Sequence, residues 1–247
     1  LDYALEKYGT MSRQQVMAPA IKLAREGFVL TRADTDVLDT TTERFKQDPE
    51  VTRIFLKPDG RSFQPGDLLV QTDLANTLEK IAQNGPSAFY EGEIPEIVEE
   101  ASKKNGGILT AKDFADFTIT DTAPVSCTYR GYQFISAPPP SSGGVTICQT
   151  LNILEGYDLK EMGFNSADYI HTLTEAMRHA YMDRNTFLGD PEFVDNPTEK
   201  LLSKAYAEEL RKEIKPNQAT PSTQVQPGIG PHEKPETTHY SVVDEKG

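Results

Sequence analysis

Capped helical segments fill most of the chain before residue 215, and they set its fold class. Ser12 precedes a stretch over 13–26 whose apolar residues fall on one helical face, and Gly27 ends it. A hydroxyl residue before such a stretch and a glycine after it are typical helix boundaries. Similar patterns predict further helices over 1–8, 74–84, 93–104, 145–154, 165–190 and 201–214. The chain is therefore predicted to be predominantly helical.

Short extended pieces lie between the predicted helices. One covers 53–57, before the turn Pro58-Asp59-Gly60, and another covers 129–136, before Pro138. Such pieces bounded by turn residues are typical of strands. They predict a small sheet that packs on the helices.

The charge pattern narrows the classes of partner. The formal net charge is −13, and the charges are scattered along the chain without a sustained basic run. Recognition of nucleic acid or of an anionic membrane needs a cationic surface, so neither is expected. No apolar stretch approaches the roughly 20 residues of a membrane span.

Two cysteines, Cys127 and Cys148, are too few for a disulfide scaffold. Cys127 has a strand-like neighbourhood and Cys148 lies on an apolar helix face. We expect separate thiols in the core, with a disulfide between them as the less favoured alternative.

One set of side chains has metal-ligand chemistry, namely His171, Glu175 and His179 on the predicted helix over 165–190. Three ligands on consecutive turns of one helix span about 12 Å and do not converge on one ion. No metal site is expected, and no cofactor. On the same helix, Asp183 and Arg184 are expected to form structural pairs.

The run Pro138-Pro-Pro-Ser-Ser-Gly-Gly144 leads into the helix over 145–154. The amino end of a helix presents free N–H groups that can bind an anion. The run lacks the Gly-x-x-x-x-Gly-Lys pattern of a phosphate loop. We therefore favour a stiff entry and an ordinary helix cap.

The chain ends with a proline-rich stretch and a hydroxyl-rich strand. Five prolines lie between residues 215 and 236, which predicts a flexible surface loop, and Thr237 opens an alternating stretch. Spacing alone favours a plain strand. If the chain were cut before Thr237, however, the freed α-amine could act as the base for the Thr237 hydroxyl.

The two ends of the sequence suggest a fragment of a longer protein. The chain starts at Leu1 on a helical stretch, and it stops at Gly247 in a turn that should lead to a second strand. A lone hairpin strand leaves its backbone groups without the usual partners.

A series of motifs in order resembles the γ-glutamyltranspeptidases, and the resemblance covers essentially all 247 residues. The motifs are Tyr8-Gly-Thr10, Ala18-Pro-Ala-Ile-Lys-Leu-Ala-Arg-Glu-Gly27, Asn84-Gly-Pro86, Phe89-Tyr90, Arg130-Gly-Tyr132, the run over 138–144, Ile153-Leu-Glu155, Tyr181-x-Asp-Arg184, Leu188-Gly-Asp-Pro191 and Thr237-Thr-His-Tyr-Ser-Val-Val-Asp244.

The resemblance implies an N-terminal-nucleophile hydrolase of the α+β class, an αββα sandwich made as one precursor. The precursor would cut itself between Glu236 and Thr237, and Thr237 would be the nucleophile. His239 matches the family pattern and is expected to orient or pack the nucleophile strand. The resemblance implies that residues 1–214 form the helical lobe of the large subunit, 215–236 a loop, and 237–247 the first strand of the small subunit.

The resemblance also implies the reaction and its partners. The substrates would be glutathione and other γ-glutamyl compounds, with water, amino acids or peptides as acceptors. The remainder of the precursor, including the small subunit, would be the protein partner, and the location would be periplasmic or secreted. The oxyanion-hole donors and the other substrate-binding side chains would lie outside this sequence, so the fragment alone is expected to be inactive.

Two alternatives remain open. A related acylase or a poly-γ-glutamate-cleaving enzyme would share the machinery and differ in its acyl group. A non-catalytic helical module could instead use its threonine-rich tail to pair with the edge of another sheet. Only the enzyme interpretations predict a break before Thr237.

Overall fold

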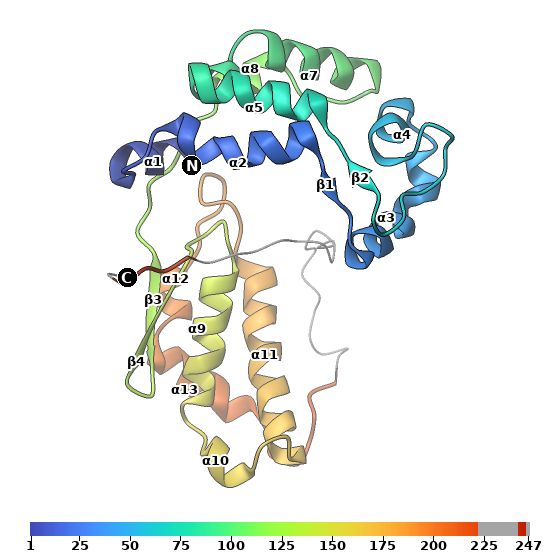
Figure 1. The fold of residues 1–247 in the computed structure, drawn as a ribbon. Coiled ribbons are helices and arrows are strands. Elements are labelled where there is room, and N and C mark those ends of the chain that lie inside the picture. Colours follow the sequence, from blue (N-terminus) through green and yellow to red (C-terminus); the bar gives the residue numbers. More distant parts are fainter. Residues whose placement is uncertain (222–241, 246–247) are drawn as a thin grey trace. The chain divides into compact units, whose positions relative to one another are not determined.

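The computed structural model describes residues 1–221 and 242–245, and Figure 1 shows its elements in chain order. The chain divides into two compact units, Leu1–Ile119 and Thr120–Gly247. Within the described residues, helices predominate and the strands form two separate two-stranded sheets. This confirms the expectation of a mainly helical chain with a few short strands.

The first unit contains eight described helices and one small sheet. Strand β1, Phe28–Val29, pairs antiparallel with β2, Leu68–Leu69. The helices are α1 Asp2–Tyr8, α2 Arg13–Glu26, α3 Arg32–Phe45, α4 Pro49–Phe55, α5 Thr72–Asn84, α6 Ser87–Tyr90, α7 Glu93–Lys104 and α8 Ala111–Ala115. Helices α2 and α5 run side by side, and small buried side chains such as Ala24, Ala75 and Ala82 lie on them.

Local capping explains where several helices begin. Ser12 and Gln15 form a reciprocal capping box at the start of α2, and Thr31 and Asp34 form another at the start of α3. A third box lies at the start of α8, with Thr110 N donating to Asp113 Oδ2 at 2.8 Å. Each such box satisfies N–H groups that the first helical turn leaves free.

One expectation for the first unit was wrong, and one helix was missed. Residues 53–57 were expected to be extended, but α4 covers most of them. Asp48 caps this helix by accepting from Glu50 N and Val51 N, and Pro49 occupies its first turn. These two signals outweigh the strand preference of the apolar residues that follow. Helix α3 was not predicted at all.

The second unit packs helices on a β-hairpin. Strand β3, Val125–Tyr129, pairs with β4, Tyr132–Ser136, through the two-residue turn Arg130-Gly131. Both turn residues have positive φ, 49° and 85°, as the tightest hairpin turns require. The helices are α9 Gly143–Leu154, α10 Leu159–Met162, α11 Ala167–Phe187, α12 Thr198–Leu201 and α13 Lys204–Glu213.

Helix α9 lies at the centre of this unit. It packs against β3, α11 and α13, and eight of its residues are buried. One apolar cluster joins α9 to α11 and α13 through residues that include Ile153, Ala176 and Leu210. A second joins α9 to the hairpin, with Val125 and Val145 among its members. The expected single helix over 201–214 is divided, because α12 ends at Leu201 and Ser203 caps α13.

The two cysteines form a disulfide, so the expectation of separate thiols was wrong. Cys127 on β3 and Cys148 on α9 are bonded, with their Cα atoms 5.9 Å apart. Both lie in the cluster between the hairpin and α9. The packing of a strand on a helix brings together two residues that are 21 positions apart in the sequence.

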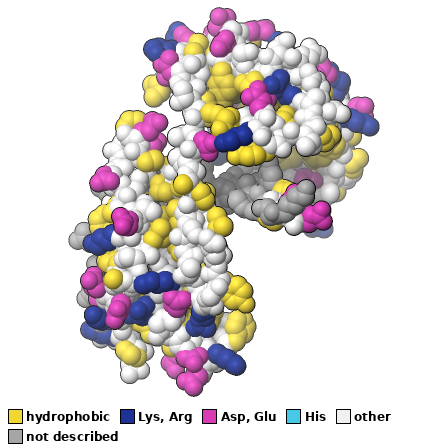
Figure 2. All heavy atoms as spheres, turned by 90° about the vertical axis from the view of Figure 1, so that its left-hand side faces the viewer, with side chains coloured by type: hydrophobic (Ala, Val, Ile, Leu, Met, Phe, Trp, Pro, Cys, Tyr) yellow, Lys and Arg dark blue, Asp and Glu magenta, His cyan; other side chains and the backbone are white. Residues whose placement is uncertain are grey.

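Charged side chains of both signs are interspersed on the face shown in Figure 2. This agrees with the scattered charges of the sequence. No helix among the described residues is both long and apolar enough to cross a membrane.

Candidate functional site

The predicted nucleophile and its neighbours, Glu236, Thr237 and His239, lie outside the described residues. The described part of the second unit contains two features near the motifs that the sequence singled out. One is a pocket between α9 and α11, and the other is a polar face of α11 that contacts the residues after α13.

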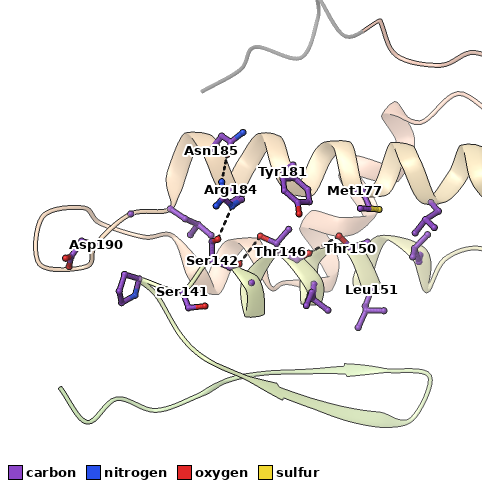
Figure 3. Close-up of a pocket in the computed structure, with 17 residues that line it drawn as sticks. Ser141, Ser142, Thr146, Thr150, Leu151, Met177, Tyr181, Arg184, Asn185 and Asp190 are labelled. Atoms are coloured by element: carbon purple, nitrogen blue, oxygen red, sulfur yellow. Dashed lines mark hydrogen bonds between the residues drawn. The ribbon is translucent and has the colours of Figure 1, made fainter. Parts of the chain in front are cut away.

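The pocket has a volume of about 920 Å³ and is lined along its length by α9 and α11. Apolar side chains, among them Ile147, Leu151 and Met177, form most of its walls. Polar groups gather at one end, where the run over 138–144 enters α9 (Figure 3). The predicted helix entry therefore opens onto a cavity.

Arg184 and Ser142 join the two helices at this end of the pocket. Arg184 Nε donates to Ser142 Oγ at 2.9 Å, and Arg184 Nη1 donates to Asn185 Oδ1 at 2.8 Å (Figure 3). Ser142 occupies the N-cap position of α9, but its side chain makes no capping hydrogen bond. Instead of the ordinary helix cap that we expected at this position, Ser142 makes a hydrogen bond to α11.

Two further hydroxyls, both on the α9 wall of the pocket, also bind protein groups. Thr146 Oγ1 donates to Ser142 O, and Thr150 Oγ1 donates to Thr146 O, both at 2.8 Å. Among the described residues that line the pocket, there is neither histidine nor cysteine. Nucleophilic catalysis by a hydroxyl needs a base within hydrogen-bond reach. The hydrogen bonds of Ser142, Thr146, Thr150 and Arg184 join α9 to α11 and to its own backbone, which indicates a structural role for these four residues.

The three residues weighed as metal ligands face different protein groups, and the buried His179 Nδ1 makes no hydrogen bond to any residue that the structure describes. His171 Nε2 lies 2.8 Å from Lys215 O, Glu175 accepts from Thr220, and His179 Nδ1 lies 4.0 Å from Glu213 Oε2. Among the described residues, no group of three or more His, Cys, Asp or Glu side chains could hold a metal ion. Asp183 is likewise used within the fold, since its Oδ2 accepts from Gln149 Nε2 at 2.5 Å.

Glu175 is the most deeply buried of these acids, with 1% of its surface exposed. Burial raises the pKa of its carboxyl, but the hydrogen bonds from Thr220 and the charges of Arg178 and His171 outweigh burial. The pKa of Glu175 therefore lies below its ordinary value. Sequence reasoning did not find this contact, because Thr220 lies in a stretch without hydrophobic periodicity.

Comparison with known proteins covers the whole chain. Residues 1–247 match the sequence model of the family described as gamma-glutamyltranspeptidase. A glutathione hydrolase proenzyme of a Pseudomonas species (strain A14) is 50% identical over 247 residues, which are 100% of this chain and 43% of that protein. The acylase ACY 1 proenzyme of another Pseudomonas (strain SE83) is 41% identical over 244 residues, or 99% of this chain and 43% of that protein.

A solved structure agrees with these sequence matches. The crystal structure of Helicobacter pylori gamma-glutamyltranspeptidase superposes on this chain with a TM-score of 0.87 at 41% identity. The superposed region covers 95% of this chain and 67% of the Helicobacter pylori chain. The chain spans less than half the length of the two curated relatives. The expected fold class, part of an N-terminal-nucleophile hydrolase of the α+β type, is confirmed. The chain belongs to the γ-glutamyltranspeptidase family of enzymes.

Proposed function

We propose that the whole protein transfers and hydrolyses γ-glutamyl groups from glutathione and other γ-glutamyl amides. The observation that carries this proposal is the family match over residues 1–247, since it includes the segment that contains Glu236, Thr237 and His239. The relative named glutathione hydrolase proenzyme supports both the reaction and its start from a precursor.

Cleavage of the precursor comes first in this proposal. Thr237 Oγ adds to the carbonyl carbon of Glu236, the bond from that carbon to Thr237 N breaks, and the nitrogen takes up a proton. Water then hydrolyses the ester between Glu236 and Thr237 Oγ. The products are a chain that ends at Glu236 and a chain that begins with the free α-amine of Thr237.

The new amine then serves the mature reaction. Its ordinary pKa is about 7.7–8.0, so a useful fraction is neutral near pH 7 and can accept the proton of Thr237 Oγ. The hydroxyl oxygen attacks the γ-glutamyl amide, and the amine of the substrate leaves. The γ-glutamyl ester on Thr237 is then transferred to water or to the amine of an amino acid or peptide.

Residues 1–247 need the remainder of the precursor for this chemistry. In the proposal, the loop over 215–236 precedes the junction, and 237–247 form the first strand of the small subunit. His239 would orient or pack that strand. We expect the isolated chain to be inactive, because the loss of even one oxyanion donor costs about 10²–10³ in rate.

The disulfide supports a periplasmic or extracellular location. Disulfides persist in oxidising compartments and are rare where thiol reductants are abundant. The Cys127–Cys148 bond lies in the core between β3 and α9, where it links two elements of one unit. A disulfide in the core is therefore consistent with export to an oxidising compartment.

A second candidate reaction has one observation in its favour. The relative named acylase ACY 1 proenzyme is 41% identical to this chain. In this alternative the same threonine would carry an acyl group other than γ-glutamyl. The two reactions would share the cleavage step and differ in the side chains that bind the acyl group.

Turnover by the full-length protein tests the proposal. The purified protein is assayed with a γ-glutamyl anilide and with an acyl anilide that lacks the α-amino and α-carboxylate groups. We expect turnover of the first substrate, and Thr237→Ala should lower it by at least about 10³-fold. Turnover of the second substrate alone would favour the acylase. Equal rates for Thr237→Ala and the unaltered protein would exclude Thr237 as the nucleophile.

A further inference from the structure

Thr220 is bound by two charged side chains of α11 that together engage all of its polar groups. Thr220 N donates to Glu175 Oε1 at 3.1 Å, and its hydroxyl donates to Glu175 Oε2 at 2.5 Å. Arg178 Nη1 donates to Thr220 O at 2.5 Å. We call Glu175 and Arg178 the Thr220 clamp.

The clamp is formed by a buried acid and a neighbouring arginine of the second unit. Glu175 is 1% exposed, and Arg178 Nε lies 3.4 Å from Glu175 Oε1. Burying the Glu175 carboxylate is costly unless hydrogen bonds and a nearby opposite charge compensate it. Much of that compensation comes from Thr220. One turn earlier on α11, His171 Nε2 lies 2.8 Å from Lys215 O, so the chain after α13 is held at two points.

The residue after Thr220 restricts the backbone at the clamp. Pro221 follows Thr220, and a residue before proline is restricted to extended backbone. Proline also fixes its own φ angle. The clamp therefore fixes the position of Thr220, and Pro221 restricts the backbone conformation at that point. The predicted junction after Glu236 lies sixteen residues farther along the sequence.

We propose that Glu175 and Arg178 are positioning residues for precursor cleavage, because they fix the start of the chain that leads to the junction. This inference rests on the proposed cleavage between Glu236 and Thr237. If the clamp is released, the next fixed point is Lys215, whose carbonyl oxygen contacts His171 Nε2. The free length before the junction then grows from sixteen to twenty-one residues.

The size of the effect follows from the length of that chain. For a flexible chain, the probability that its end reaches a target falls with about the 3/2 power of length, which gives roughly a 1.5-fold slower cleavage. We expect release of the clamp to slow cleavage by about 1.5- to twofold.

The test uses the full-length precursor and four variants. Thr220→Val removes the hydroxyl at nearly constant volume, and Glu175→Gln removes the negative charge of the clamp. Thr220→Ser keeps every clamp hydrogen bond and should restore the rate. Thr174→Val is the matched control, because Thr174 Oγ1 donates to Ile170 O on an exposed turn of the same helix. The cleavage rate is followed by intact mass, and kcat and KM are measured for the processed fraction.

The inference predicts slower cleavage in Thr220→Val and Glu175→Gln, rates near the unaltered one in Thr220→Ser and Thr174→Val, and unchanged kcat and KM after processing. Cleavage of Thr220→Val at the unaltered rate would overturn it and leave the proposed function intact. Loss of kcat in step with cleavage would also overturn it, since that marks a general structural defect. An unaltered precursor that stays whole would overturn both.

Discussion

Both carboxylate oxygens of Glu175 accept hydrogen bonds from Thr220, one from the backbone N–H and one from the hydroxyl. The contact joins α11 to a residue 45 positions later, beyond the end of the last described helix. It is made by the charged form of the acid, so its strength depends on pH.

The stability that Glu175 contributes should disappear in acid. The pKa of Glu175 is lower in the folded protein than its ordinary value of 4.5. Its contribution is therefore fully present above that value and is lost as the pH falls through the lower pKa of the folded state. Urea unfolding of the protein and of Glu175→Gln at about pH 7 and about pH 3 measures this. The difference in free energy of unfolding between the two proteins should be smaller at about pH 3 than at about pH 7. A difference that is constant or larger in acid would contradict a lowered pKa of Glu175.

Two adjacent glycines at the start of α9 should respond in opposite ways to alanine. A Cβ on the buried Gly144 would lie 2.6 Å from Ala137 O and 3.0 Å from Ser136 Cβ, whereas a Cβ on the exposed Gly143 would meet only Ser141 Oγ at 4.0 Å. Alanine favours a helix over glycine by up to about 1 kcal/mol. Overpacking costs about 1–3 kcal/mol.

Gly144→Ala should therefore lower the free energy of unfolding, because the clash with backbone outweighs the helix preference. Gly143→Ala should leave it unchanged or raise it slightly. Urea unfolding of the two variants side by side is the measurement. Equal effects would mean that the chain at Ser136 and Ala137 yields to the added methyl group.

The disulfide between Cys127 and Cys148 should contribute strongly to stability. A cross-link over a loop of this length lowers the entropy of the unfolded chain and is worth about 3 kcal/mol. The double variant Cys127→Ala, Cys148→Ala should unfold at a lower urea concentration. Thiol reductant should destabilise the unaltered protein and leave the double variant as it was. A reductant effect of equal size on both proteins would point to another cause.

Helix boundaries were predictable where the signals are local. The predicted ranges 13–26 and 93–104 are those of α2 and α7 in the structure. Ser12 and Gly27 explain the first case, since a cap and a positive-φ glycine act within one turn. Helix α4 carried a signal of the same kind in Asp48 and Pro49, but the apolar residues after it favoured a strand.

Contacts between distant segments were not predictable from spacing. The disulfide depends on how α9 packs on β3, and the two cysteines share no local pattern. The tie from Arg184 to Ser142 and the clamp on Thr220 connect residues 42 and 45 positions apart. For the nucleophile, Thr237 had only a strand pattern of its own, and its role was inferred from motifs spread along the whole chain. That role stays a prediction, because Thr237 lies outside the described residues.

The mass of the full-length protein tests the central claim most directly. The unaltered protein and Thr237→Ala are purified in the same way and measured intact under denaturing conditions. The account predicts two chains for the unaltered protein, the second beginning at Thr237, and one unbroken chain for Thr237→Ala. An unbroken unaltered protein, or the same break in both proteins, would contradict it.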